Sequence, residues 1–251
     1  MKKLFFDAFL LIFLTIASFW IVLSIKPVQV TIMSYNVRHC AGMDLVVDYD
    51  RTANVIAENQ PDVVALQELD SITGRSGRKY QLGELANRTN YNPIFGKAID
   101  YDGGGYGVGI LTKKQPLSTK RIPLPGEEPR VLLIVELANY VIACTHLDLE
   151  EDARLASIPL IINEAENWQK PLILAGDWND YPNSQLLQEL TKYFTINSEN
   201  DFTFPADKPN ECIDYVATFN NCPAKTIESA VVDEPEASDH RPLMVNLSFC
   251  R

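Results

Sequence analysis

Short apolar runs alternate with polar segments along most of the chain. Four of these runs are rich in Val, Ile and Leu, which is typical of buried strands: Val28–Met33, Val63–Leu66, Tyr140–Cys144 and Leu172–Ala175. Extending each run to its polar ends, and adding the other apolar stretches, predicts strands at Gln29–Val37, Asp62–Leu69, Gly107–Thr112, Arg130–Leu137, Tyr140–His146, Leu172–Asp177, Ile213–Thr218 and Arg241–Leu247.

The clearest helical pattern lies at Glu151–Trp168, where apolar residues recur on one face. Two further helices are expected, one starting at a cap on Asp48 or Asp50 and ending at Asn59, the other at Gln81–Thr89. Helices mixed with many strands, including a hairpin, indicate an α/β protein with two packed sheets and helices outside them.

The N-terminal segment has a different composition. Ala8–Ile25 has no charged residue and follows Lys2 and Lys3. Together with the preceding residues it would span about 33 Å as a helix, enough to cross a bilayer. We therefore divide the chain into a membrane anchor or signal segment (1–27) and a folded domain (28–251).

An uncleaved anchor is favoured over a cleaved signal peptide, because Thr15-Ile16-Ala17 matches a cleavage site poorly. A buried helix of the domain is the third reading. By the positive-inside rule, the domain would face the periplasm or the extracellular space, and it would be secreted if the segment is cleaved.

Length and charge narrow the choices for the remaining chain. With 251 residues, of which 46% are apolar and 22% charged, it fits one globular domain after the N-terminal segment. The net charge is −11; residues 1–27 contribute +2, which leaves −13 on residues 28–251. Such an acidic domain lacks the basic face usual in binders of long nucleic acids, although a bound metal can offset charge locally.

The five cysteines leave the redox compartment open. Cys40 and Cys144 are expected to be small buried hydrophobes, and Cys250 could be free. Cys212 and Cys222 flank a predicted strand and could pair in an oxidising compartment.

Short polar clusters stand at the ends of the apolar runs. They are Ser34-Tyr35-Asn36, Gln67-Glu68, Thr145-His146-Leu147-Asp148, Gly176-Asp177-Trp178-Asn179 and Ser238-Asp239-His240-Arg241-Pro242. Oxygen ligands from Asn, Glu and Asp suit a hard cation such as Mg²⁺, and the imidazoles offer proton transfer near neutral pH. The set indicates metal-assisted phosphoester hydrolysis.

In their order along the chain and in their residues, these clusters resemble the motifs of the endonuclease/exonuclease/phosphatase superfamily over about residues 28–249. The resemblance implies a four-layer α/β sandwich of two mixed β-sheets flanked by helices, as in deoxyribonuclease I. It also implies an enzyme that depends on Mg²⁺, with Mn²⁺ as a substitute.

The resemblance carries a role to each matching residue. Asn36, Glu68 and Asp239 would bind the metal. Asp177 would orient or deprotonate the attacking water, and Asn179 would hold that water or a phosphate oxygen. His240, with its ring fixed by Asp214, would contact the scissile phosphate or act as a base. His146 would stabilise the transition state or protonate the leaving oxygen.

Three arginines are candidate substrate ligands. Arg130 matches a position where many relatives have an arginine near the phosphate, with a surface ion pair as the alternative. Arg75 and Arg78 could contact substrate from the loop after Glu68. His39 is expected to be structural, or to contact the residues that bind metal or substrate without binding either itself.

The sequence leaves the substrate open. The leading hypothesis is an extracytoplasmic phosphodiesterase resembling nucleases. A lipid-directed phosphodiesterase similar to sphingomyelinases, or a phosphatase, is the alternative, and an inactive binding module is a minor one. The partners would thus be nucleic acid, a phospholipid headgroup or a small phosphate ester, with the membrane bound through the N-terminal segment. The protein is expected to be a monomer.

Overall fold

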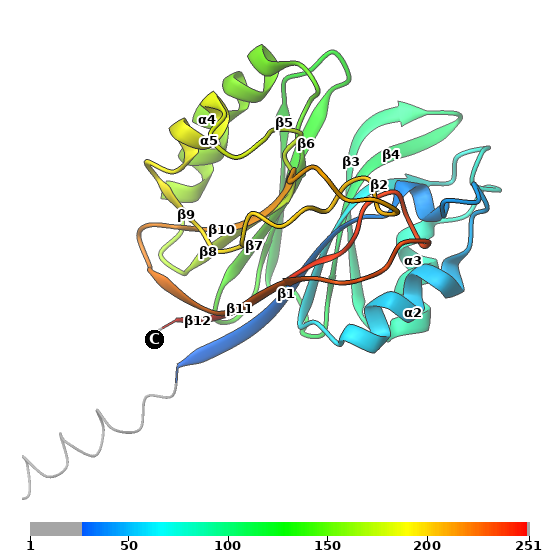
Figure 1. Ribbon diagram of the computed structural model, residues 1–251, viewed down its shortest axis with the longest axis horizontal. Coiled ribbons are helices and arrows are strands. Elements are labelled where there is room, and N and C mark those ends of the chain that lie inside the picture. Colours follow the sequence, from blue (N-terminus) through cyan, green and yellow to red (C-terminus); the bar gives the residue numbers. More distant parts are fainter. Residues whose placement is uncertain (1–26, 250–251) are drawn as a thin grey trace, which may run out of the picture.

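The computed structural model describes residues 27–249, which form two six-stranded sheets packed face to face (Figure 1). The first sheet has the order β11-β12-β1-β2-β4-β3. Its strands are β1 (Val28–Asn36), β2 (Val63–Ser71), β3 (Asn92–Tyr101), β4 (Gly104–Thr112), β11 (Ala224–Val231) and β12 (Leu243–Phe249).

The second sheet has the order β5-β6-β7-β8-β10-β9. Its strands are β5 (Ser118–Leu124), β6 (Arg130–Glu136), β7 (Val141–His146), β8 (Leu172–Asp177), β9 (Phe194–Ile196) and β10 (Asp214–Phe219). The apolar runs identified in the sequence form the central strands of both sheets, where burial on both faces requires continuous apolar residues.

Helices cover the outer face of each sheet (Figure 1). α2 (Tyr49–Asn59) and α3 (Gln81–Thr89) lie on the first sheet, and α4 (Glu151–Glu166) and α5 (Gln185–Leu190) on the second. A short 3₁₀ helix, η1 (Arg38–Cys40), follows β1. The predicted four-layer α/β sandwich of two mixed sheets is therefore confirmed.

The residue that caps α2 is Asp48. Its side chain accepts hydrogen bonds from the backbone N–H groups of Asp50 and Arg51, so that two N–H groups of the first turn have partners. This decides between the two caps considered from the sequence.

The core has three layers. Side chains between the two sheets form the central layer, with Ile32 and Val63 from the first sheet facing Leu133 and Ile142 from the second. A layer under α4 and α5 and another under α2 and α3 complete it. Apolar contacts between the two sheets thus fix their relative position.

Strand direction brings the polar clusters to one edge. β1 and β2 are parallel in the first sheet, and β7 and β8 are parallel in the second, so each pair ends at the same edge. β6, β10 and β12 run antiparallel to these strands and therefore begin at that edge. Residues at the ends of some strands and at the starts of others, such as His146 and Arg130, consequently meet.

Several strands have too little apolar character to have been predicted from the sequence. β3, β5, β9 and β11 are missing from the predicted set, and α4 ends at Glu166 instead of Trp168. β5 and β11 are edge or near-edge strands with many exposed side chains, which explains their weak pattern. Cys212 and Cys222 are both free thiols, so the pairing considered from the sequence is absent.

The membrane prediction requires a correction. Among the helices of residues 27–249, none combines the length and apolar character that a membrane span requires. The transmembrane prediction is thus contradicted for the part of the chain that the structure describes. Ala8–Ile25, on which that prediction rested, lies outside the described residues.

The central layer should dominate stability. Leu133 is fully buried between the sheets, whereas Leu117 is 62% exposed. Replacing Leu133 by Ala should lower the free energy of unfolding by about 2–5 kcal/mol, because it removes buried methyl groups and leaves a cavity. Leu117→Ala is the matched control and should change it by less than about 0.5 kcal/mol. Urea denaturation of both variants measures the difference; equal losses would contradict this assignment of the core.

Candidate active site

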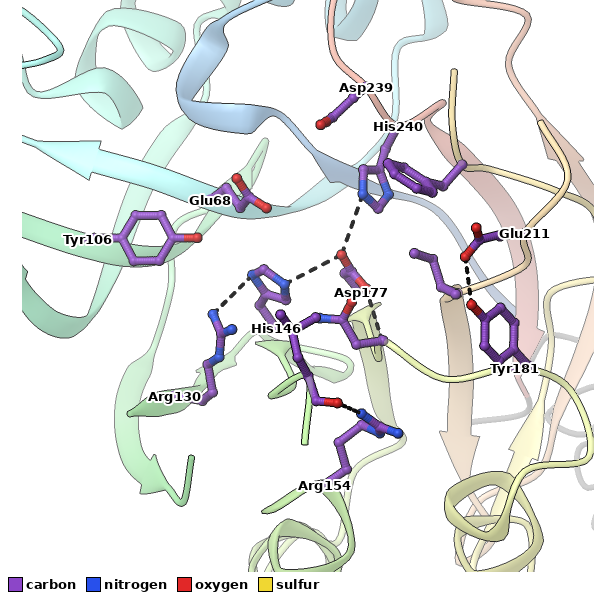
Figure 2. Close-up of a pocket in the computed structure, with 14 residues that line it drawn as sticks. Glu68, Tyr106, Arg130, His146, Arg154, Asp177, Tyr181, Glu211, Asp239 and His240 are labelled. Carbon is purple, nitrogen blue, oxygen red and sulfur yellow. Dashed lines mark hydrogen bonds and ion pairs between the residues drawn. The ribbon is translucent and has the colours of Figure 1, made fainter. Parts of the chain in front are cut away.

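A cavity of about 570 Å³ opens at the polar edge (Figure 2). The polar clusters at a bulge within β2, at the ends of β7 and β8 and before β12 all contribute to its walls. It is lined by Glu68, Tyr106, Arg130, His146, Leu149, Arg154, Asp177, Asn179, Tyr181, Phe204, Glu211, Ile213, Asp239 and His240. Its volume suits a small molecule.

Three buried side chains of the second sheet form a row, and two of them, His146 and Asp177, line the cavity. In the register of the second sheet, Asp177 pairs with His146 on β7 and with Asp214 on β10. Residues in register across neighbouring strands present their side chains to the same face. All three side chains are buried, so electrostatic interactions among them are strong.

His240 contacts two carboxylates of this row. Its Nδ1 lies 2.9 Å from Oδ2 of Asp214, and its Nε2 lies 3.7 Å from Oδ2 of Asp177. Burial lowers the pKa of His240. The charge of Asp214 and the hydrogen bond to it outweigh this effect, so that the pKa is raised to about 10. The imidazole is therefore protonated at neutral pH, with Nδ1–H donated to Asp214.

The Asp214 carboxylate is itself held in place. Thr203 donates its hydroxyl to Oδ2 of Asp214 at 2.6 Å, and the ring of Phe204 lies 4.8 Å from the His240 ring. These contacts fix the orientation of the His240 ring, as predicted for a pair of His240 and Asp214.

His146 has the opposite protonation state. Burial lowers the pKa of His146 to about 4, because the attraction of Asp177 offsets only part of the lost hydration and Arg130 adds an unfavourable charge. A guanidinium nitrogen of Arg130 lies 3.5 Å from Nδ1 of His146 and can only donate. Nδ1 is therefore the acceptor, and Nε2–H points toward Oδ2 of Asp177 at 3.5 Å.

Asp177 joins the two sheets. Its Oδ2 accepts a hydrogen bond from the side-chain amide of Asn36, on the first sheet, at 3.0 Å. Its Oδ1 accepts from the backbone N–H of Asn179 at 3.0 Å. Burial raises the pKa of Asp177, although the two imidazoles act against this. Asp177 is thus a proton acceptor more basic than an exposed aspartate.

Asn179 takes a left-handed backbone conformation, with φ at 51°. Asparagine tolerates this region better than most residues. Its side-chain amide donates to the carbonyl of Leu147 at 2.9 Å, which ties the loop after β8 to the loop after β7. The side chain lines the cavity, as its predicted role requires.

The predicted metal ligands come from β1, β2 and the loop before β12, on the first-sheet side of the cavity. The Asn36 amide donates to Glu68 at 3.0 Å. Glu68 sits at a bulge in β2, where the register with β4 shifts, and has φ at 58°. Such bulges redirect a side chain, and a positive φ in a glutamate indicates a constraint imposed by its surroundings.

Asp239 reaches the same side of the cavity from the loop before β12. The neighbouring Ser238 donates its hydroxyl to the carbonyl of Asn36 at 2.7 Å, which fixes that loop beside β1. Arg38 Nε lies 3.3 Å from Oδ2 of Asp239. Oxygen atoms of Asn36, Glu68 and Asp239 fit a hard cation such as Mg²⁺.

A second group would also suit a metal by spacing alone. Asp177, Asp214 and His240 offer ligand atoms that all lie within 4.8 Å of one another. However, Oδ2 of Asp214 already accepts from Thr203 and contacts the protonated His240. A protonated imidazole is no metal ligand, so we assign this group to proton transfer and charge stabilisation.

Arg130 lies in the site, while Arg75 and Arg78 do not line the cavity. Arg130 is buried, 2.7 Å from Glu128 and 3.7 Å from Asp148. Arg75 forms two hydrogen bonds with the buried Asp70, and Arg78 donates to backbone carbonyls of its own and a neighbouring loop. Both arginines thus order this loop, and their contacts with substrate stay a prediction.

Sequence reasoning missed part of the cavity wall. Tyr106, Arg154, Tyr181 and Glu211 line it but belong to none of the motifs. Arg154 lies on α4, where its side chain is buried and donates a hydrogen bond to Asp180 at 3.1 Å. His39, predicted to be structural, accepts at its backbone carbonyl from Gln81 at 2.6 Å.

Comparisons with known proteins agree with this geometry. Residues 33–240 match the model of the Endonuclease/Exonuclease/phosphatase family. No curated protein matches the chain by sequence.

Several solved structures share the fold. An endonuclease/exonuclease/phosphatase from Beutenbergia cavernae has a TM-score of 0.76 and 21% identity, covering 88% of this chain and 72% of that one. Another from Bacteroides vulgatus has a TM-score of 0.73 and 20% identity, covering 88% and 99%. A mannosyl-6-phosphatase from Bacteroides thetaiotaomicron has a TM-score of 0.69 and 18% identity, covering 87% and 99%.

The low pKa of His146 makes stability depend on pH. Its folded value is about 4, and the unfolded value is about 6.5, so between these pH values the unfolded chain binds the proton more strongly. Stability should therefore fall as the pH drops from about 6.5 to 4, by up to about 1.4 kcal/mol per pH unit from this group. In His146→Gln that part of the slope should vanish.

Urea denaturation of the metal-free protein and of His146→Gln, across this pH range, measures the slope. Imidazole NMR provides an independent readout, because His146 should remain neutral at pH 6. Titration of His146 near pH 6.5 would contradict the buried, neutral state.

Proposed function

The chain belongs to the endonuclease/exonuclease/phosphatase family, and on that basis we propose that it hydrolyses a phosphate ester with water and a divalent cation. The observation that carries the proposal is the arrangement of the cavity. Oxygen ligands from the first sheet face the buried row of His146, Asp177 and Asp214 from the second sheet across a cavity of about 570 Å³.

The residues that would hold the cation are Asn36, Glu68 and Asp239. Glu68 lines the cavity, and among the described residues no lysine or arginine forms an ion pair with it, so its charge is available to a cation. When bound, Mg²⁺ would supply positive charge that neutralises the phosphate and stabilises charge developing in the transition state. Mn²⁺ is expected to substitute.

Asp177 is best placed to act on the attacking water. Its raised pKa makes it a better proton acceptor than an exposed aspartate, and the Asn179 N–H fixes one of its oxygens. In the reaction the water oxygen bonds to phosphorus and one of its protons passes to Asp177, while the bond from phosphorus to the ester oxygen breaks. The leaving oxygen takes up a proton from solvent water, and Asp177 later releases its proton to solvent. The Asn179 side chain, at the cavity wall, would hold the water or a phosphate oxygen.

The two imidazoles would act as hydrogen-bond donors with different charges. Protonated His240 cannot take a proton from water, so of the two roles considered from the sequence we favour contact with the phosphate. Neutral His146 presents Nε2–H on the other side of Asp177 and would stabilise charge on the transferring phosphoryl group. Arg130 holds Nδ1 of His146 as an acceptor and adds positive charge near the phosphate.

A small phosphate ester fits the cavity better than a long polyanion. Residues 28–251 carry a net charge of −13, which disfavours extended nucleic acid. The volume of the cavity suits a small ligand, and one structure with this fold is a mannosyl-6-phosphatase. We therefore favour the phosphatase or small-phosphodiester reading over the nuclease-like one.

Loss of the cation or of Glu68 should abolish most hydrolysis. Glu68→Gln removes a charge and leaves a neutral amide, which binds Mg²⁺ more weakly. We expect kcat/KM on p-nitrophenyl phosphate or bis-p-nitrophenyl phosphate to fall at least about 100-fold, with partial recovery at high Mg²⁺. The matched control is Glu58→Gln, an exposed glutamate on α2, which should retain activity.

The assay compares Mg²⁺, Mn²⁺ and EDTA for each variant, after thermal melts show that each is folded. Full activity in EDTA, or in Glu68→Gln at low Mg²⁺, would refute the metal assignment.

A further inference from the structure

One carboxylate of the cavity wall has no role in the proposed chemistry. Glu211 lines the cavity, and among the described residues no cationic side chain forms an ion pair with it. Its side-chain partner is Tyr181, whose hydroxyl donates to Oε2 of Glu211 at 2.8 Å. A negative charge beside a site for a phosphate anion is unfavourable unless another part of the ligand compensates for it.

Glu211 differs in this respect from the acidic residues around it. Asp180 pairs with Arg154 at 3.1 Å, and Asp239 lies 3.3 Å from Arg38. Asp148 lies 3.7 Å from Arg130. These three carboxylates thus have arginine partners, whereas Glu211 has none and, unlike Glu68, is assigned no cation in the proposed chemistry.

The position of Glu211 is fixed by its backbone. Thr203 and Phe204 donate their backbone N–H groups to the Glu211 carbonyl, and Glu211 donates to the Phe204 carbonyl at 2.9 Å. These backbone contacts form a short hairpin between Thr203 and Glu211. The hairpin also contacts the catalytic residues, since the Thr203 side chain bonds Asp214. Glu211 is therefore held at a set place relative to His240 and is not a freely moving surface side chain.

Tyr181 orients the carboxylate. Its chain position follows Asp180 in the loop after β8, and the hydrogen bond to Glu211 joins that loop to the hairpin. With its proton donated to Glu211, the Tyr181 oxygen has only acceptor capacity left. The pair thus presents acceptors, and the groups it can bind are hydrogen-bond donors.

The pair lies away from the metal side. Figure 2 shows Tyr181 and Glu211 on one side of Asp177. Glu68 and Arg130 lie on its other side (Figure 2). A phosphate placed against the imidazoles and the proposed metal ligands would direct one of its substituents toward this wall.

We propose that Glu211 and Tyr181 form a specificity site for a hydrogen-bond donor, a hydroxyl or an ammonium, on the alcohol portion of a small phosphate ester. This inference rests on the proposed function, because it assumes that the phosphate binds at the metal side. Phe204, whose backbone bonds that of Glu211, and Ile213 also line the cavity and would enclose the carbon skeleton of such an alcohol.

The test uses two matched sets of substrates. One set contains propyl, glycerol and 2-aminoethyl phosphate, assayed by phosphate release. The other contains p-nitrophenyl diesters of the same three alcohols, assayed by colour. The three alcohol portions are similar in size, but the propyl group has no donor, the glycerol group has hydroxyls and the 2-aminoethyl group has an ammonium. We define selectivity as the kcat/KM of each donor-bearing ester divided by that of the propyl ester.

The wild type should prefer one donor-bearing ester over the propyl ester by at least about tenfold. Glu211→Ala should remove this preference and leave the rate on the propyl ester within about twofold. Glu211→Gln separates the two donors, because the amide oxygen still accepts from a hydroxyl but has no charge for an ammonium. A glycerol preference should therefore survive in large part, and a 2-aminoethyl preference should be lost.

Two further variants complete the design. Tyr181→Phe should weaken the preference without changing the propyl rate, because it frees the carboxylate to turn. Glu166→Gln, an exposed glutamate at the end of α4, is the matched control and should leave all rates unchanged. Turnover with equal rates on the three alcohols, or a preference that survives Glu211→Ala, would overturn the specificity site. No turnover of either set would instead count against the proposed function.

Discussion

The site depends on the register of three strands in the second sheet. β7 and β8 are parallel and β10 is antiparallel to β8, and their registers put His146, Asp177 and Asp214 in one row. A slip of one residue in either pairing would turn these side chains to the opposite face of the sheet. The apolar layer between the sheets holds this register, and the hydrogen bond from Asn36 to Asp177 extends the row to the first sheet.

This row gives two imidazoles different charges within one cavity. Asp214 keeps His240 protonated, with a pKa of about 10, while burial and Arg130 keep His146 neutral, with a pKa of about 4. Asp177 stands between them and has a raised pKa of its own. Residues of the same type can thus serve as a fixed cation and as a neutral donor because their neighbours differ. This division supports water activation at the aspartate and charge stabilisation at the imidazoles.

Much of this site could be predicted because its residues follow apolar runs. Asn36 and His146 end strands, and the order of the clusters indicated the family, so the fold and the central residues were within reach of the sequence. The contact of Arg75 with the buried Asp70 could not be predicted, because no sequence pattern marks that pair. The contact between Tyr181 and Glu211 joins two loops that only the tertiary fold brings together, so no periodic pattern marks it.

The most direct test of the row is the coupling between Asp214 and His240. A double-mutant cycle would measure kcat on an activated phosphate ester, at saturating Mg²⁺, for His240→Ala, Asp214→Asn and both together in proteins shown to be folded. Asp214 acts through the ring that it orients and charges, so the double variant should be little slower than His240→Ala alone. Losses that multiply would mean that the two residues act independently, which would contradict the account.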